Sequence, residues 1–255
     1  MSASIAALLQ AWDNQPDQQP LRVVTGLDGR DKLQVRVDLG VLQLEMTGRP
    51  DGQRPYGFES ILDYHAHRLS DYTARFGSAE GFRLNSLDCE AIRDEAELYY
   101  RRYFSLLQLE RYREVSVDTA RNLRAADFLE AHASSADESW PLSRFRPYIV
   151  MMNALARAEM HVDEYDHTAA ERVLATAMAA VRHFGARHFG EVTVDQELAA
   201  LGERLREIQA HRPRSESDRL QRRLAQAIER EDFELAARLR DQLRDLSSSG
   251  RGPSD

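Results

Sequence analysis

The sequence contains little cysteine, little lysine and no long apolar run. Cys89 is the only cysteine, so this chain cannot form an internal disulfide or a zinc site built from cysteine pairs. In a reducing compartment a lone cysteine is typically a small buried hydrophobic residue. No segment approaches the ~20 apolar residues of a membrane helix, and residues 1–12 have neither the basic region nor the apolar core of an export signal. We therefore expect a cytoplasmic protein with no membrane span.

Positive charge is scarce as well. The net charge is -8, and Lys32 is the only lysine, so nearly all the cations are arginines. A chain with this balance repels nucleic acid, and we do not expect it to bind nucleic acid directly. Its 255 residues, 42% of them hydrophobic, are enough for one large domain or two modest ones with real cores.

Residues 1–86 are predicted to form a small mixed α/β domain. A short amphipathic helix is expected over residues 3–13, before the polar break DNQPDQQP. Apolar and polar residues then alternate between Leu33 and Val41, after a Gly-Leu-Asp-Gly turn and with a turn or bulge at Gly40. This pattern predicts a small antiparallel sheet.

The rest of the chain is dominated by the helical period. Asp166 or Thr168 is expected to cap one long helix, and Gly185 to end it. Helices are expected at approximately 58–76, 88–111, 116–133, 147–163, 167–184, 195–210, 217–229 and 233–247.

Three of the expected helix junctions contain an aromatic residue, namely Tyr112, Tyr165 and Phe233. An aromatic side chain at such a junction can wedge between the two helices, as it does in tetratricopeptide-type hairpins, which this pattern resembles. The three aromatics are 53 and 68 residues apart, whereas a regular array repeats every 34 residues. We therefore interpret residues 87–210 as an irregular tetratricopeptide-like helical domain.

The last two expected helices, within residues 216–247, are predicted to form a separate hairpin, followed by a flexible tail at 248–255. Asp232 is a suitable N-cap for the second helix, and Glu234 is spaced to pair with Arg238. On a helix that turns about 100° per residue, the first helix carries one apolar stripe and the second carries two. The surplus stripe, which we expect to remain free for a partner, consists of Leu235, Leu239, Leu243 and Leu246.

The segment LQRRLAQAIEREDFELAARLRDQL resembles the UVR motif, a helical hairpin found in UvrB, UvrC and McsA-type partners of Clp proteases. The chain as a whole resembles bacterial proteins described by this motif alone. In the family the hairpin docks on another protein, commonly a second such hairpin, and does no chemistry. This chain departs from the family proteins because it lacks both the GxxxxGK[ST] phosphate loop and the zinc-binding cysteine pairs. The partner-binding residues that the resemblance implies are Leu220, Leu224, Ile228, Phe233, Leu235, Leu239, Arg240, Leu243 and Leu246.

The loop at residues 47–60 is the second candidate site. Arg49 and Arg54 lie on this Gly/Pro-stiffened segment and could hold a phosphate or a carboxylate, although such a segment is more often an ordered connector.

The histidines lack the spacing of a helical metal pair, so we expect no metal and no cofactor. The acidic run from Asp88 to Glu97 is interpreted as a complement to a helix dipole. We interpret four aromatic residues as packing residues of the core and the helix junctions, namely Tyr99, Tyr100, Tyr103 and Phe104.

The sequence thus predicts an α+β fold that is mainly α, with a small N-terminal antiparallel sheet, tetratricopeptide-like helical hairpins and a C-terminal UVR hairpin. The predicted function is a non-catalytic protein-protein interaction adaptor, linked to nucleotide excision repair or to Clp-type protein quality control. Its partner would be a UvrB/UvrC-type protein, a Clp-type protein or a second copy of itself. The alternative is a small-ligand-binding protein or an enzyme with its site in residues 21–60, in which the hairpin serves for recruitment.

Overall fold

The computed structural model describes residues 6, 9, 12, 20–38, 40–211 and 216–249, with backbone alone for 216–219, 222 and 247–249. Most of the helix expected at 3–13, the linker at 212–215 and the tail beyond residue 249 lie outside the described residues.

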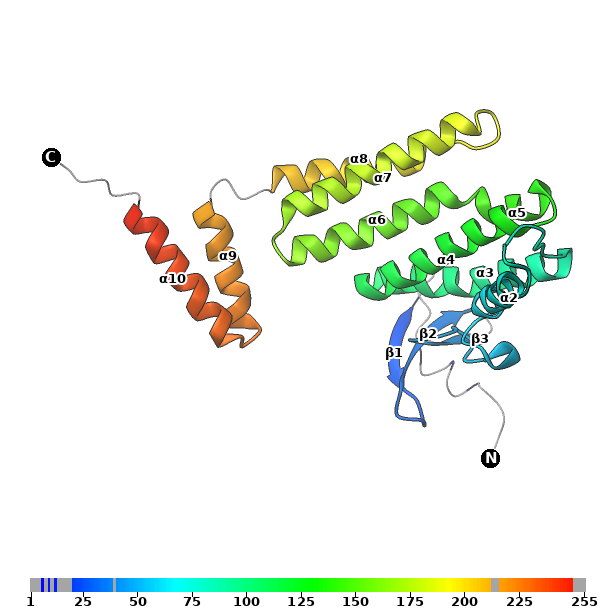
Figure 1. Cartoon of the computed structure of the whole chain (residues 1–255). Coiled ribbons are helices and arrows are strands. Elements are labelled where there is room, and N and C mark those ends of the chain that lie inside the picture. Colours follow the sequence, from blue (N-terminus) through cyan, green and yellow to red (C-terminus); the bar gives the residue numbers. More distant parts are fainter. Residues whose placement is uncertain are drawn as a thin grey trace.

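The described chain is mainly helical and begins with a small sheet, as predicted (Figure 1). Among the described helices, none combines the length and the apolar character that a membrane crossing requires. The strands are β1 (Leu21–Thr25), β2 (Asp31–Val37) and β3 (Gly40–Glu45). The helices are η1 (Pro55–Gly57), α2 (Ile61–Phe76), α3 (Ser86–Gln108), α4 (Tyr112–His132), α5 (Ala136–Ser143), α6 (Arg146–Asp163), α7 (His167–Arg187), α8 (Asp195–Ala210), α9 (Glu216–Glu229) and α10 (Phe233–Ser249).

The sheet is an antiparallel meander in the order β1-β2-β3. Val37 pairs with Gly40, so Gly40 directly follows a tight turn, as the sequence predicts. Leu33 pairs with Leu44, and both side chains are buried on the face that meets the helices. Lys32 lies on the opposite face, where its ammonium contacts Asp28 at 2.7 Å and Glu45 at 2.6 Å. The only lysine of the chain is therefore held in a local ion-pair cluster.

The buried face of the sheet shares one apolar cluster with the helices. Leu33 and Leu44 pack into the cluster that also contains Tyr103 and Leu106 of α3 and Leu174 of α7. A second cluster lies around the start of α2 and the faces of α3 and α4. The boundary predicted at residue 86 therefore separates two parts that share their packing.

Buried arginines attach the sheet and the following loop to the helices. The Arg102 guanidinium of α3 makes two hydrogen bonds of 2.7 Å to the carboxylate of Asp118 on α4. The same side chain donates to the backbone carbonyls of Glu45 and Gly48, at 2.8 and 2.9 Å. Both charged groups are only 3% exposed. Buried charges are stable only when they are paired and hydrogen-bonded, and these two groups meet both conditions.

Three helix junctions share one backbone geometry. Each contains a non-glycine residue with left-handed φ, near 55°, and the next residue donates its N–H to a carbonyl five residues earlier. This is the pairing of a Schellman C-cap. The left-handed residues are Glu110, Tyr165 and Glu231, and the hydrogen bonds run from Arg111 to Leu106, from Asp166 to His161 and from Asp232 to Ala227.

The aromatics at these junctions are not equivalent, contrary to the prediction. Tyr112 and Phe233 stand two residues after the left-handed position, whereas Tyr165 occupies that position itself. Phe233 is 69% exposed and does not wedge between its helices. The tetratricopeptide-like character of residues 87–210 stays a prediction, although successive helices do pack as neighbours (Figure 1).

The expected helices differ from the structure in several places: α4 begins at Tyr112 and not at 116, one expected helix end is wrong, and one helix was not expected. The α7 helix is capped by Asp166, whose side chain accepts a hydrogen bond from the Ala169 N–H, as predicted. It passes through Gly185 and ends at Arg187, so the expected stop at Gly185 is wrong. The short α5 helix was not predicted, because Pro141 lies inside it and interrupts the helical pattern.

Candidate docking hairpin and tyrosine groove

Local hydrogen bonds fix the turn between α9 and α10. The Asp232 carboxylate accepts a hydrogen bond of 3.0 Å from the Leu235 N–H, which confirms Asp232 as the N-cap of α10. Arg238 donates to Glu234 at 3.0 Å, the predicted pair on the exposed face. The helices lie side by side in Figure 1, joined by the left-handed turn at Glu231.

The hairpin has a small apolar core of its own. Leu239 is 2% exposed and packs with Leu220 of α9, while Ala227 and Ala236 are small enough to let the two helices approach closely. The half-buried members of the same cluster are Leu224, Leu235 and Leu243.

The expectation of a free leucine stripe is therefore wrong for Leu239. The sequence predicts two apolar stripes on α10, of which the leucine stripe was expected to stay free while the other one contacts α9. In the structure the leucine side faces α9, so Leu239 is sealed within this chain and Leu235 and Leu243 are partly covered. Leu220 is also buried, at 7% exposure, and contributes to the hairpin core.

The exposed apolar side chains of the hairpin are Ile228, Phe233 and Leu246, which are 55%, 69% and 38% exposed. Ile228 and Phe233 flank the turn and form what we call the tip patch. Leu246 lies 13 residues after Phe233 along α10, which separates their backbones by roughly 20 Å. Arg240 is exposed between them. The hairpin thus offers two separate apolar contact points rather than one continuous stripe.

The tip patch is surrounded by negative charge. Glu229, Glu231, Asp232 and Glu234 are all exposed around it, and Arg230 is the only cation among these neighbours. An acidic surface of this kind repels phosphate backbones and favours a partner with basic residues at the edge of its contact.

The hairpin core is separate from the core of the helical body. Its apolar residues form a cluster that contains only residues of α9 and α10. Among the described residues, a hydrogen bond of 2.7 Å from the Gln226 side-chain amide to the Asp163 carbonyl at the end of α6 joins the two parts.

The two loop arginines that were predicted to hold an anion do not act together. Arg49 is 14% exposed and contacts Asp51 at 3.0 Å and the buried Glu95 at 3.5 Å. Arg54 is 63% exposed and contacts Glu59 at 2.5 Å. Each guanidinium already has a carboxylate neighbour, so this geometry does not favour an anion site in the loop.

We expect Arg49→Met to lower the free energy of unfolding by about 1–3 kcal/mol, because it removes a charged contact to a buried carboxylate. Arg54→Met should change it by less than about 0.5 kcal/mol, because its ion pair is exposed. Urea denaturation of the two variants measures the difference. Equal effects of the two substitutions would show that Arg49 is not part of the buried network.

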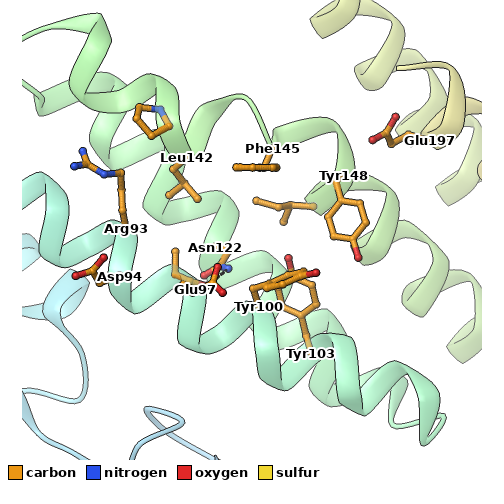
Figure 2. A pocket seen from close by; sticks show the side chains of 13 residues that line it. Arg93, Asp94, Glu97, Tyr100, Tyr103, Asn122, Leu142, Phe145, Tyr148 and Glu197 are labelled. Carbon is orange, nitrogen blue, oxygen red and sulfur yellow. Dashed lines mark hydrogen bonds between the residues drawn. The ribbon is translucent and has the colours of Figure 1, made fainter. Parts of the chain in front are cut away.

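The helices enclose a groove that the sequence does not predict. It has a volume of about 720 Å³ and is walled by residues of α3, α4, α5, α6 and α8 (Figure 2). Tyr100 and Tyr103 of α3 and Tyr148 of α6 lie together in it, with ring centroids 5.5 Å (Tyr100 to Tyr103) and 6.2 Å (Tyr100 to Tyr148) apart. The three tyrosines come together because α3 and α6 both pack against α4, which sequence spacing does not reveal.

The surroundings of the tyrosines disfavour negative charge. Burial, which is the largest cause, together with nearby Tyr100 and Glu197 raises the pKa of Tyr148 to about 12. Burial also raises the pKa of Tyr103, again with Tyr148, Tyr100 and Glu97 acting in the same direction. The hydroxyls of Tyr103 and Tyr148 therefore stay protonated at neutral pH.

The other residues that could take part in catalysis or metal binding have structural roles in this fold. Cys89 is fully buried, as predicted, and burial raises the pKa of its thiol. Within the described residues, no group of three or more His, Cys, Asp or Glu side chains is placed to hold a metal ion.

In the acidic run at the start of α3, Asp88 forms a capping box with Asn85. Glu95 is buried and accepts hydrogen bonds from the first N–H groups of α2.

Comparison with known families agrees with the hairpin geometry. Residues 216–249 match the family model described as the UvrB/uvrC motif (UVR), a match that covers α9 and α10. Comparisons with curated proteins and with solved structures found no match. The hairpin α9-α10 therefore carries the UvrB/uvrC motif.

Proposed function

We propose that this protein is a non-catalytic adaptor that docks onto another protein through the hairpin α9-α10. The observation that carries the proposal is the tip patch: Ile228 and Phe233 are exposed, although the hairpin closes its own core without them. Exposed aromatic and aliphatic side chains next to a rigid turn are suitable anchors for a partner's pocket.

The contact is expected to be weak and exchangeable. Full burial of an exposed Ile or Phe side chain contributes about 1.5–3 kcal/mol, and association costs at least ~4 kcal/mol. The tip patch and Leu246 together supply only a modest surplus, so the partner should exchange readily.

The partner is proposed to be a different protein with an apolar pocket bordered by basic residues, of the UvrB/UvrC type or from a Clp-type system. Glu229, Glu231 and Asp232 give the tip a negative charge. Two copies that met tip to tip would bring these carboxylates together, which is unfavourable. Self-association through the tip patch is therefore disfavoured. The alternative ligand site in residues 21–60 gains no support from the paired state of Arg49 and Arg54.

The test is affinity capture from an extract of the source cells with three versions of the full chain. Wild type and the control variant Asp241→Asn/Arg244→Gln should retain the same proteins, because this exposed pair on α10 lies outside the tip patch and outside the acidic residues around it. Ile228→Ser/Phe233→Ser should lose them at least tenfold, as quantified by mass spectrometry. Sedimentation velocity on the purified wild-type chain should show a monomer.

Retention of the same proteins by Ile228→Ser/Phe233→Ser would contradict docking through the tip patch. A stable dimer that this variant disrupts would instead identify a second copy as the occupant.

A further inference from the structure

The tyrosine groove is lined by three tyrosines, Tyr100, Tyr103 and Tyr148. The Tyr103 side chain is 1% exposed and lines the groove, and none of the described residues makes a hydrogen bond to its hydroxyl. The same holds for the hydroxyls of Tyr100 and Tyr148 within the described chain, and Figure 2 shows Tyr148 pointing toward the other two rings. Polar groups at the wall of a groove are normally hydrogen-bonded to water when no ligand is bound. Three tyrosine hydroxyls that line one groove are therefore available to a polar ligand atom that takes the place of this water.

The charged residues around the groove determine which ligand charge it favours. Three carboxylates line it, those of Asp94 and Glu97 on α3 and Glu197 on α8. Glu97 also contacts Arg101 on the outer surface, at 3.2 Å. Arg93 is the only cation among the described lining residues. Its guanidinium already donates to Glu138, at 2.7 Å to the carbonyl and 3.3 Å to the carboxylate. The groove is therefore electrostatically negative, and an anion would find no unpaired cation in it.

The remaining lining is apolar. Leu142 of α5 and Ile149 of α6 are buried in the wall, and Phe145 between these helices is 50% exposed. A volume of about 720 Å³ falls within the range of small-molecule sites. Aromatic faces carry partial negative charge and attract cations, more strongly where water is excluded.

We propose that this groove binds a small organic cation, a primary ammonium group on an apolar stem. The ammonium lies among Tyr100, Tyr103 and Tyr148, where its N–H groups donate to the hydroxyl oxygens and its charge faces the aromatic rings. Glu197 complements the positive charge from across the groove (Figure 2). The stem packs on Phe145 and Leu142. A neutral apolar ligand would leave the hydroxyls unpaired, and a carboxylate would meet like charge.

The test uses three probes of the same shape and different charge with the full-length protein. We expect 2-phenylethylammonium to bind at least tenfold more tightly than 2-phenylethanol, and phenylacetate not to bind, as measured by calorimetry and by saturation-transfer NMR. Equal binding of the ammonium and the alcohol would overturn the proposal. So would tighter binding of phenylacetate, or the absence of ammonium binding at millimolar concentration.

Two variants assign the binding to the groove. Tyr103→Phe removes the buried hydroxyl with little change of shape, and Glu197→Gln removes the opposing charge; each should weaken ammonium binding three- to tenfold. The matched control is Glu203→Gln, an exposed carboxylate on the same helix α8 that does not line the groove. Thermal melting verifies that each variant is folded. Ammonium binding that is unchanged in both groove variants would place the cation elsewhere.

Discussion

Replacing Glu95 with glutamine is expected to lower the free energy of unfolding by about 3–5 kcal/mol. Glu95 is 1% exposed, and its carboxylate accepts hydrogen bonds from the N–H groups of Ile61 and Leu62, at 2.7 and 3.2 Å. The same carboxylate pairs with the buried Arg121 and with Arg49. Glutamine preserves the volume but removes the charge, so Arg121 would remain buried without its counter-ion.

Urea denaturation of the full-length protein, followed by far-UV circular dichroism, measures this effect. The matched control is Glu90→Gln, an exposed carboxylate on the same helix α3, for which we expect a change within about 0.5 kcal/mol. If Glu95→Gln were as stable as the control, Glu95 could not be the charge that joins α2, α3 and α4.

Replacing Leu239 with alanine is expected to unfold the hairpin α9-α10 while the helical body stays folded. Leu239 is 2% exposed and belongs to a cluster with only three other buried residues. Truncation of a buried leucine costs about 2–5 kcal/mol, and isolated helices of this length are marginal in water. Because the hairpin core is separate from the body, the loss should remain local.

Hydrogen exchange read by mass spectrometry distinguishes the two parts of the chain. In Leu239→Ala the amides of residues 216–249 should lose their protection, while those of α3, α4 and α6 keep theirs. Leu246→Ala, which truncates a leucine that is 38% exposed, should leave the protection of the hairpin nearly unchanged. Loss of protection in the body of Leu239→Ala, or full protection of its hairpin, would contradict the separation of the two cores.

Local patterns in the sequence were sufficient for much of the fold. Alternation around Leu33 and the turn at Gly40 predicted the meander, because strand periodicity and turn chemistry are local properties. Asp166 and Asp232 predicted two helix starts correctly, since an N-cap acts within three residues. Gly185 misled because a glycine is tolerated inside a helix whose tertiary packing continues past it.

The orientation of packed helices could not be predicted from the sequence. A helical wheel gives two apolar sides for α10 but does not say which side meets α9, so Leu239 was assigned to the free surface. Phe233 was expected to wedge between the two helices because it stands at their junction, and it is exposed. The resemblance to the UVR motif identified the hairpin, but the structure was needed to separate its core from its surface.

Contacts between residues distant in sequence were also out of reach. Glu95 stabilises the start of α2 from 34 residues away, and the sequence shows only one more carboxylate in an acidic run. Tyr100 and Tyr148 meet because α3 and α6 both pack against α4. A single sequence carries no signal for either contact.

The most direct test of the docking surface is site-specific photo-cross-linking in the source cells. Benzoylphenylalanine is placed at Phe233 in the tip patch and, as a control, at Arg238 on the exposed face of the same helix. The proposed adaptor function predicts a covalent adduct with another protein from position 233 and none from position 238. An equally strong adduct from position 238, or no adduct from position 233, would contradict it.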